Sequence, residues 1–308
     1  MKTRIVKWVL RSKKKHVYDE NFDVALARKH REKNMTKVCG KPPKDVNIES
    51  VAFTANRAYM YTPKNLQSDR ILLYFHGGAY VASDIDIYNG FVARFCRALG
   101  VRGYSFEYPL APENPYPIGV NACIEFYRAL VSGGCDPKKI IVGGDSAGGG
   151  LAVAMCAELL RQKIATPEML LLFSPWVDMT MSGETIRTNV EHDLMITTHL
   201  LENAAKLYCA GTNPKNAGVS PVFGKFQNFP PTYILAATDE LLCSDAEMLH
   251  DAMERDGVDV YLSLWHDAQH AFIVGMHLFP ESTAVMANIR EFVDTRIGRP
   301  ASTVTPAL

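Results

Sequence analysis

The chain has 308 residues, of which 47% are hydrophobic and 21% are charged. This composition supplies a sizeable core and excludes a disordered or strongly solvated chain. Basic and acidic residues are equal, at 33 each, so the chain lacks the basic excess with which proteins bind nucleic-acid backbones. We expect one α/β domain with insertions, and no nucleic acid among its partners.

The cysteines and the apolar runs indicate the compartment. Seven cysteines are scattered along the chain without a Cys-x-x-Cys pair, which argues against a disulfide framework and against a zinc site. No apolar run approaches the roughly 18 residues that a membrane-spanning helix needs. We therefore expect a soluble, cytoplasmic protein with reduced thiols.

The N-terminus differs from the rest of the chain. Residues 1–15 carry seven basic side chains and no acidic one. As a helix, this segment would place Ile5, Trp8 and Val9 on one face and the cations on the other, a pattern that can lie on an anionic membrane. Weak contact with a lipid surface is therefore one hypothesis. Packing of the same face against the protein's own surface is the favoured alternative, because most amphipathic helices do so.

From residue 46 onward, predicted strands and helices alternate. In chain order we expect strands at 46–53, 57–61 and 70–75, a helix at 87–99, a strand at 101–108, a helix at 120–131, a strand at 139–142, a helix at 148–162, a strand at 169–173, a helix at 197–209, a strand at 232–237, a helix at 245–255, a strand at 258–265 and a helix at 281–296. This alternation predicts a mostly parallel sheet that is flanked by helices. The interval 174–231 is longer than a crossover needs, so part of it is expected to form a cap over the sheet.

The segment Gly144–Gly148 reads G-x-S-x-G between a predicted strand and a predicted helix. This context is that of a nucleophile elbow, in which a sharp turn exposes the serine at the edge of the sheet. The glycines remove Cβ atoms that would clash with neighbouring backbone. We therefore expect Ser146 to be a nucleophile, although a glycine-rich packing turn would produce the same string.

The segment His76–Tyr80, which reads HGGAY, follows the predicted strand 70–75 directly. Consecutive glycines let backbone N–H groups approach a substrate oxygen closely. We expect an oxyanion hole made by the N–H groups of Gly77, Gly78 and Ala147. His76 is expected to be structural, because the histidine that serves a G-x-S-x-G serine comes later in the chain.

A serine hydroxyl needs a base and an orienting carboxylate, in the chain order Ser, Asp or Glu, His. Asp239 follows the strand 232–237 at the edge of the sheet and is the expected carboxylate. Glu240, one residue deeper in the turn, and Asp245, at the start of the next helix, are its competitors.

Three downstream histidines compete for the role of base. His270 occupies a loop and is the expected base. His266 directly follows a strand and has little room to reach across, which makes it the alternative. His277 lies close to the last helix and is less suitable.

In combination these motifs resemble the hormone-sensitive-lipase-like esterases and lipases of the α/β-hydrolase fold. The resemblance covers roughly residues 71–296 and rests on six segments: His76–Tyr80, Tyr108–Glu113, Gly144–Gly149, Ser174–Asp178, Asp239–Leu241 and His270–Phe272. It implies a triad of Ser146, Asp239 and His270 that hydrolyses short to medium acyl esters through an acyl-enzyme. It implies a small-molecule ester substrate, neither metal nor organic cofactor, and a homodimer.

The resemblance also predicts how the chain is divided. Residues 1–45 are expected to form an N-terminal helical cap segment, residues 46–300 the catalytic domain with a cap insertion within 178–230, and residues 301–308 a flexible tail. An amidase or an arylacetamide-deacetylase-like deacylase could use the same triad. A non-catalytic receptor on this fold is less favoured, because such receptors usually lose a triad member.

Three positions depart from the family pattern. Ala79 replaces a third glycine, and Glu240 stands where proline often follows the triad aspartate. Pro109 stands where the family usually has an arginine in its Y-R-L-A-P-E segment. We expect the loss of this positive charge to weaken the loop around Glu113 rather than the triad.

Overall fold

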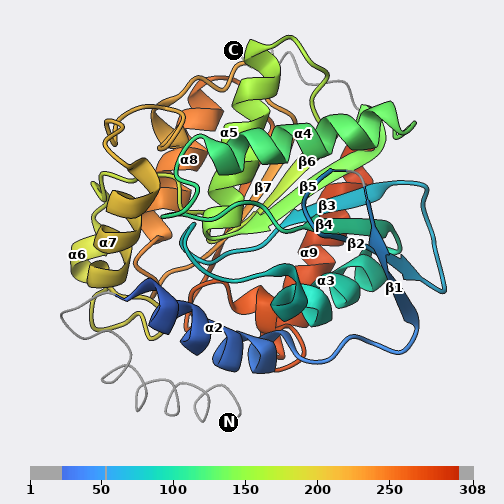
Figure 1. The fold of residues 1–308 in the computed structure, drawn as a ribbon, viewed down its shortest axis with the longest axis horizontal. Coiled ribbons are helices and arrows are strands. Elements are labelled where there is room, and N and C mark those ends of the chain that lie inside the picture. Colours follow the sequence, from blue (N-terminus) through green and yellow to red (C-terminus); the bar gives the residue numbers. More distant parts are fainter. Residues whose placement is uncertain (1–22, 53, 298–308) are drawn as a thin grey trace.

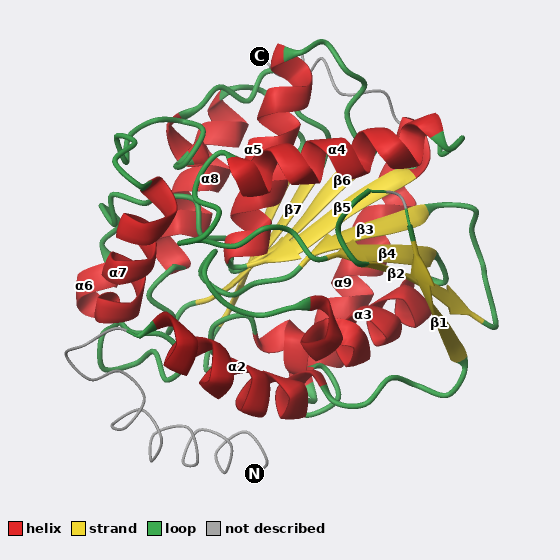
Figure 2. Ribbon diagram, viewed as in Figure 1, coloured by secondary structure: helices red, strands yellow, loops and turns green. Residues whose placement is uncertain are grey.

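The computed structural model describes residues 23–52 and 54–297. The predictions for residues 1–15 and 301–308 therefore lie outside the described residues. Within the described ranges, helices cover both faces of one central sheet (Figures 1 and 2). No helix among them is long and apolar enough to cross a membrane.

The sheet has eight strands in the order β1-β2-β4-β3-β5-β6-β7-β8. The strands are β1 Val46–Val51, β2 Ala58–Pro63, β3 Ile71–Phe75, β4 Arg102–Phe106, β5 Ile140–Asp145, β6 Met169–Phe173, β7 Thr232–Ala237 and β8 Val260–Trp265. β2 pairs antiparallel with both β1 and β4, and all other neighbours are parallel. The prediction of a mostly parallel sheet is confirmed.

Helices lie between and beyond the strands, and three short 3-10 helices interrupt the loops in the described part of the chain. The α-helices are α2 Val24–Cys39, α3 Ile85–Leu99, α4 Ile118–Ser132, α5 Ala147–Arg161, α6 Thr185–Thr188, α7 Thr198–Cys209, α8 Cys243–Arg255 and α9 Glu281–Arg296. The 3-10 helices are η1 Pro137–Lys139, η2 Pro221–Phe223 and η3 Phe272–Gly275. The predicted helix 197–209 in the long insertion is confirmed as α7.

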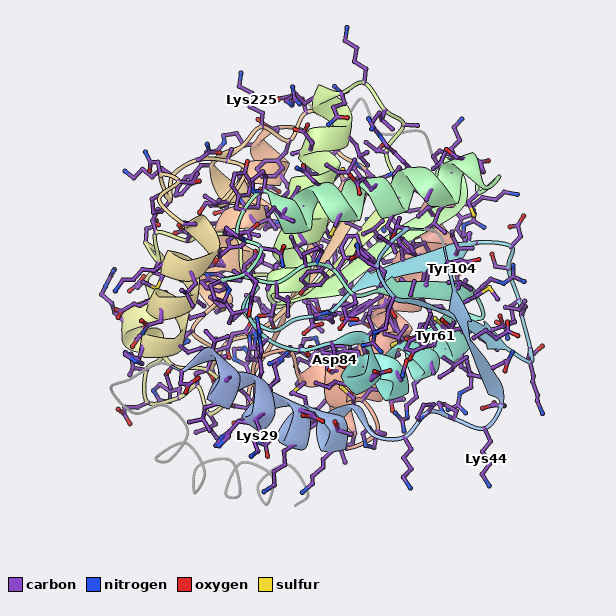
Figure 3. All side chains as sticks on the ribbon, viewed as in Figure 1. Lys29, Lys44, Tyr61, Asp84, Tyr104 and Lys225 are labelled. Atoms are coloured by element: carbon purple, nitrogen blue, oxygen red, sulfur yellow. The ribbon has the colours of Figure 1, made fainter. Side chains whose placement is uncertain are left out.

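The sheet separates two apolar cores. Leu73 and Phe75 of β3 face α4, α5 and α8, whereas Leu72 and Tyr74 face α3 and α9. A strand that is buried on both faces has no polar alternation, which explains why β3 is apolar throughout. Charged side chains such as Lys29 extend from the surface instead (Figure 3).

Local signals account for the ends of several helices. Asp84 caps α3 by accepting a hydrogen bond from the N–H of Ile87, and Gly100 ends this helix with a left-handed φ of 70°. Asp23 caps α2 in the same way. Helix α2 buries only Met35 and Cys39 within its described length, so its apolar pattern is weak. For this reason the sequence gives no clear boundaries for α2.

The strand register brings several loops to one edge of the sheet. Phe75 pairs with Gly144, and Asp145 pairs with Phe173. The loops that follow β3, β5 and β6 therefore start side by side. Since β7 and β8 continue the parallel arrangement, their following loops start at the same edge.

Candidate active site

The turn between β5 and α5 holds Ser146 in a strained conformation. Its φ of 53° and ψ of −122° lie in a region that non-glycine residues rarely occupy. Three backbone hydrogen bonds fix the residue: its N–H donates to Phe173 O (2.9 Å), and its carbonyl accepts the N–H groups of Trp176 (3.0 Å) and Gly150 (3.1 Å). A Cβ at Gly148 would lie 2.1 Å from Phe75 O, so this position requires glycine. The turn therefore has the form of the predicted nucleophile elbow.

The acidic partner of His270 is Glu240. Nδ1 of His270 lies 2.9 Å from Oε2 of Glu240, and the Glu240 side chain is fully buried. Asp239 is only partly buried, and its Oδ1 accepts a hydrogen bond from the Thr238 hydroxyl. The expectation that Asp239 orients His270 is therefore corrected, because Glu240 takes that place.

The turn after β7 explains why Glu240, and not Asp239, bonds to His270. The N–H of Ala237, the last residue of the strand, donates to Oε1 of Glu240 at 3.3 Å, and the N–H of Glu240 donates to the carbonyl of Ala237. These bonds fold the Glu240 side chain back beneath the strand end. Two adjacent acidic residues follow β7, and the strand pattern ends before them, so the sequence alone does not decide between them.

The competing residues have other partners. Asp245 is buried near the start of α8, where its Oδ2 accepts the N–H groups of Val177 and Asp178 at 2.9 Å each. His266 is exposed, with its Nδ1 3.2 Å from the Thr238 hydroxyl. His277 packs beside Gly40. His270 is thus the downstream histidine that meets a buried carboxylate within the described residues.

Opposing influences act on the pKa of His270. Burial lowers the pKa, whereas the hydrogen bond to Glu240 and the negative charges of Glu240, Asp193 and Asp145 raise it. The charges prevail, so the pKa lies above its usual value. A carboxylate on Nδ1 fixes the tautomer in which Nε2 is free to accept a proton.

The loop after β3 provides N–H donors, but not all of those predicted. The Gly77 N–H donates to Oδ1 of Asp145 at 3.0 Å, because this buried carboxylate also needs donors beyond the hydroxyls of Tyr74 and Tyr88. The prediction that Gly77 contributes to the oxyanion hole is therefore corrected.

Three other N–H groups near the elbow are available. Across residues 23–52 and 54–297, the N–H groups of Gly78, Ala79 and Ala147 donate no hydrogen bond. Ala147 is the first residue of α5, where helix N–H groups have no intrahelical acceptor. Gly78 has a φ of 143°, and a Cβ there would lie 1.8 Å from Ala82 O. Ala79 is thus a donor that the predicted set did not include.

His76 supports this loop from behind. Its ring stacks on Tyr108 with centroids 4.3 Å apart, and its Nδ1 lies 2.9 Å from Gly77 O. Burial lowers the pKa of His76 to about 4, so the ring is neutral at pH 7. These contacts fit the structural role expected from the sequence.

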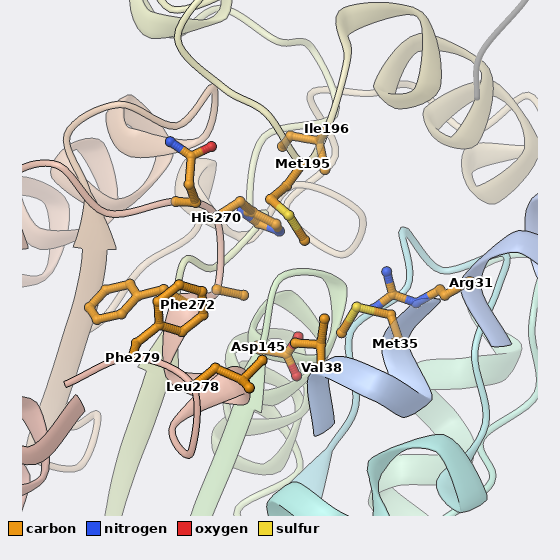
Figure 4. Close-up of a pocket in the computed structure, with 12 residues that line it drawn as sticks. Arg31, Met35, Val38, Asp145, Met195, Ile196, His270, Phe272, Leu278 and Phe279 are labelled. Atoms are coloured by element: carbon orange, nitrogen blue, oxygen red, sulfur yellow. The ribbon is translucent and has the colours of Figure 1, made fainter. Parts of the chain in front are cut away.

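A mainly apolar cavity of about 80 Å³ opens beside His270 and Asp145 (Figure 4). Helix α2 contributes Met35 to its wall, and the long insertion contributes Met195 and Ile196. Two segments far apart in the sequence therefore line this cavity together. Among the described residues, one group has the spacing of metal ligands: His250, Asp251 and Glu254, on the outer surface of α8.

Comparisons with known proteins agree with this geometry. A family model described as the alpha/beta hydrolase fold matches residues 72–274. A crystal structure of an esterase from the bacterial hormone-sensitive lipase family superposes with a TM-score of 0.89 at 29% identity, covering 96% of this chain and 98% of that one. The chain belongs to the hormone-sensitive lipase family of α/β-hydrolases. It is therefore an enzyme of the carboxylesterase and lipase class.

Curated relatives of this hydrolase include two bacterial enzymes of similar length. An esterase of Acinetobacter venetianus is 31% identical over 72% of this chain and 74% of its own length. An acetyl-hydrolase of Streptomyces hygroscopicus is 30% identical over 75% of this chain and 78% of its own length. The matched lengths span most of each relative.

In this chain Pro109 replaces the arginine of the family's Y-R-L-A-P-E segment, and helix α2 supplies a positive charge instead. Arg28 forms two hydrogen bonds with the carboxylate of Glu113, at 2.8 and 2.7 Å. The same guanidinium donates to the carbonyls of Val81 and Ala111. The expectation of a weakened loop at Pro109 is therefore corrected, because Arg28 ties this loop to the cap helix.

We expect Arg28→Ala to lower the stability of this hydrolase by about 1–2 kcal/mol, because the loops lose a bidentate partner and two further hydrogen bonds. Denaturation in urea at pH 7 measures this loss, and Arg28→Lys, which keeps the charge but not the fork, is expected to restore only part of it. An unchanged midpoint in Arg28→Ala would contradict the assignment.

The ion pair also predicts a pH dependence. Hydrogen bonds from Arg28 lower the pKa of Glu113 to about 2. A carboxyl whose pKa is depressed by folding stabilises the fold above its unfolded pKa of 4.5, and this stabilisation is lost as the pH falls towards 2. Glu113 is largely exposed, so its share is below about 1 kcal/mol. The difference between the wild type and Arg28→Ala should be smaller at pH 3 than at pH 7.

Proposed function

We propose that this hydrolase cleaves carboxylic esters with a triad of Ser146, His270 and Glu240. The observation that carries the proposal is the buried hydrogen bond between His270 and Glu240, at the same sheet edge as the strained serine. Burying a carboxylate costs free energy that its partners must offset. The imidazole of His270 is such a partner here, and this pairing suits a carboxylate that orients the ring and balances its charge.

In the first half of the reaction, Ser146 Oγ attacks the ester carbonyl while Nε2 of His270 takes the hydroxyl proton. The N–H groups of Gly78, Ala79 and Ala147 stabilise the oxyanion of the tetrahedral intermediate. His270 then gives its proton to the leaving alcohol, and an acyl-enzyme forms on Ser146. Glu240 holds the imidazolium throughout.

In the second half, His270 takes a proton from water, and the resulting hydroxide attacks the acyl-enzyme. A second tetrahedral intermediate forms in the same oxyanion hole. Its collapse releases the carboxylic acid and returns the proton to Ser146 Oγ. The chain's own residues therefore perform every proton transfer of the cycle.

The cavity beside His270 favours short acyl groups. An apolar cavity of about 150 Å³ is large enough for benzene, whereas this one has about 80 Å³. Met195 of the insertion and Met35 of α2 bound it. We infer that α2, within the predicted N-terminal cap segment 1–45, and the insertion within 178–230 act as a cap that limits the acyl chain to about two to four carbons.

Hydrolysis of p-nitrophenyl esters from acetate to palmitate tests this proposal. We expect kcat/KM to be highest for acetate to butyrate and to fall at least tenfold by octanoate. Met195→Ala, which enlarges the cavity, is expected to extend the range towards longer chains. A maximum at palmitate would contradict the size argument, and cleavage of p-nitroacetanilide faster than p-nitrophenyl acetate would favour an amidase.

Two further predictions concern partners. The family resemblance predicts a homodimer, which size-exclusion chromatography with light scattering tests. Weak lipid contact through residues 1–15 predicts that co-sedimentation with anionic vesicles falls when these residues are deleted. Unchanged co-sedimentation of the truncated chain would count against lipid contact.

A further inference from the structure

The insertion does more than cover the active site, because one segment of it, residues 189–196, contacts both loops that carry the acid and the base. The side-chain amide of Asn189 donates to the carbonyls of Thr238 (2.8 Å) and Glu240 (2.9 Å). On the other side, the N–H of Leu194 donates to Oε1 of Gln269 at 2.8 Å. The segment therefore bonds to the backbone of Glu240 itself and to Gln269, the neighbour of His270.

Asp193 lies at the centre of this segment and is fully buried. Its Oδ2 accepts the N–H of Leu241, the residue after Glu240, at 2.9 Å. Its Oδ1 accepts the N–H groups of Met195 and Ile196, at 2.7 and 3.0 Å. The Asp193 carboxylate thus connects the backbone next to Glu240 to Met195 and Ile196, two residues of the insertion that line the cavity.

Burial raises the pKa of Asp193, whereas the charge of His270 and the three N–H donors act to lower it. These three donors suit an ionised carboxylate, which only accepts hydrogen bonds. The charges that act on His270 come from several elements: Glu240 after β7, Asp193 in the insertion and Asp145 at the end of β5. Arg31 of α2 is a cation that lines the same cavity as His270. Of the three carboxylates, Glu240 is bonded to His270 and Asp145 directly precedes Ser146. Asp193 is the carboxylate with neither connection.

We propose that Asp193 is a positioning residue of the cap, whose carboxylate holds the Glu240 loop in place and stabilises the imidazolium of His270. This inference rests on the proposed function. It implies that the cap and the acid–base pair form one unit, so a change in cap packing alters the basicity of His270 as well as the shape of the cavity. Acyl-chain selectivity and catalytic rate are then coupled through a single buried charge.

Titration of the histidine ring signals by NMR tests this proposal without relying on activity. In the full-length Asp193→Asn protein, we expect the pKa of His270 to fall by about one unit, because a nearby negative charge that favours the imidazolium is removed. His270→Gln identifies the signal. Asp178→Asn is the matched control, because Asp178 is also fully buried but bonds to its own neighbours Thr180 and Ser182.

The pH profile of p-nitrophenyl acetate hydrolysis gives the second measurement. In Asp193→Asn, the acid limb of kcat/KM is expected to move to lower pH by the same amount, and kcat at the optimum to fall about tenfold. Asp193→Glu keeps the charge and is expected to leave the limb near its wild-type position. A loss of stability alone would lower the melting temperature without moving the limb.

The outcomes separate the inference from the proposed function. An unchanged His270 pKa in Asp193→Asn, or an equal shift in Asp178→Asn, overturns the inference even if the wild type is an active esterase. An inactive wild type overturns the proposed function, while the NMR titration still decides the role of Asp193. Should Asp193→Asn fail to fold, Asp193→Ser carries the same expected shift, since its hydroxyl can still accept nearby N–H groups.

Discussion

Ser146→Ala is expected to lower kcat for p-nitrophenyl acetate by about 10⁴- to 10⁶-fold, because the N–H donors and the cavity alone provide only residual catalysis. The fold should persist, since alanine keeps the Cβ atom and the backbone hydrogen bonds of Ser146 do not involve the hydroxyl. Steady-state kinetics measure the loss, and circular dichroism checks the fold. Activity within tenfold of the wild type would exclude Ser146 as the nucleophile.

Ser146→Gly provides a matched control for this variant. Both substitutions remove the hydroxyl, so both should be equally inactive. Glycine also adopts the φ of 53° without the strain that a Cβ brings. We therefore expect Ser146→Gly to melt at a higher temperature than Ser146→Ala. A lower melting temperature would show that the elbow is not strained.

Glu240→Gln is the second substitution with a large expected effect. It should lower kcat by about 10³- to 10⁴-fold, because the amide no longer holds the correct tautomer of His270 or balances the imidazolium. Asp239→Asn, at the adjacent position, should change kcat by less than about twofold, since the carboxylate bonded to Nδ1 of His270 is that of Glu240. Kinetics of the two variants at one pH decide between the two carboxylates.

The opposite ranking, with Asp239→Asn inactive and Glu240→Gln active, would restore the expectation drawn from the sequence. A pH profile adds an independent check. The hydrogen bond and the charge of Glu240 both raise the pKa of His270. Residual activity of Glu240→Gln should therefore extend to lower pH than that of the wild type.

The centre of the sheet could be predicted from the sequence because β3, β5, β6 and β7 are buried on both faces. Short continuous apolar runs such as β6 at Met169–Phe173 are typical of strands that helices cover on both faces. The nucleophile elbow could also be predicted, because its glycines lie within a few residues of Ser146 in the sequence. Gly148 is required by contact with the backbone at Phe75, and the sequence shows that requirement as G-x-S-x-G.

The parts that could not be predicted depend on contacts across the fold. The choice of Glu240 over Asp239 depends on how one turn folds back on Ala237. The loss of Gly77 from the donor set depends on a carboxylate that is distant in the sequence. Likewise, no local pattern predicts that Arg28 pairs with Glu113. In each case, the outcome depends on a hydrogen bond or ion pair between groups that only the tertiary structure brings together.

The most direct test of the mechanism is covalent labelling with a fluorophosphonate ester, followed by intact-mass analysis and peptide mapping. An activated serine displaces fluoride and gains one phosphonyl group, whereas an ordinary serine does not react at neutral pH. We predict one adduct per wild-type chain on the peptide that contains Ser146, none in Ser146→Ala, and labelling slowed at least 100-fold in Glu240→Gln. An adduct on another residue, or undiminished labelling of Ser146→Ala, would contradict the proposed mechanism.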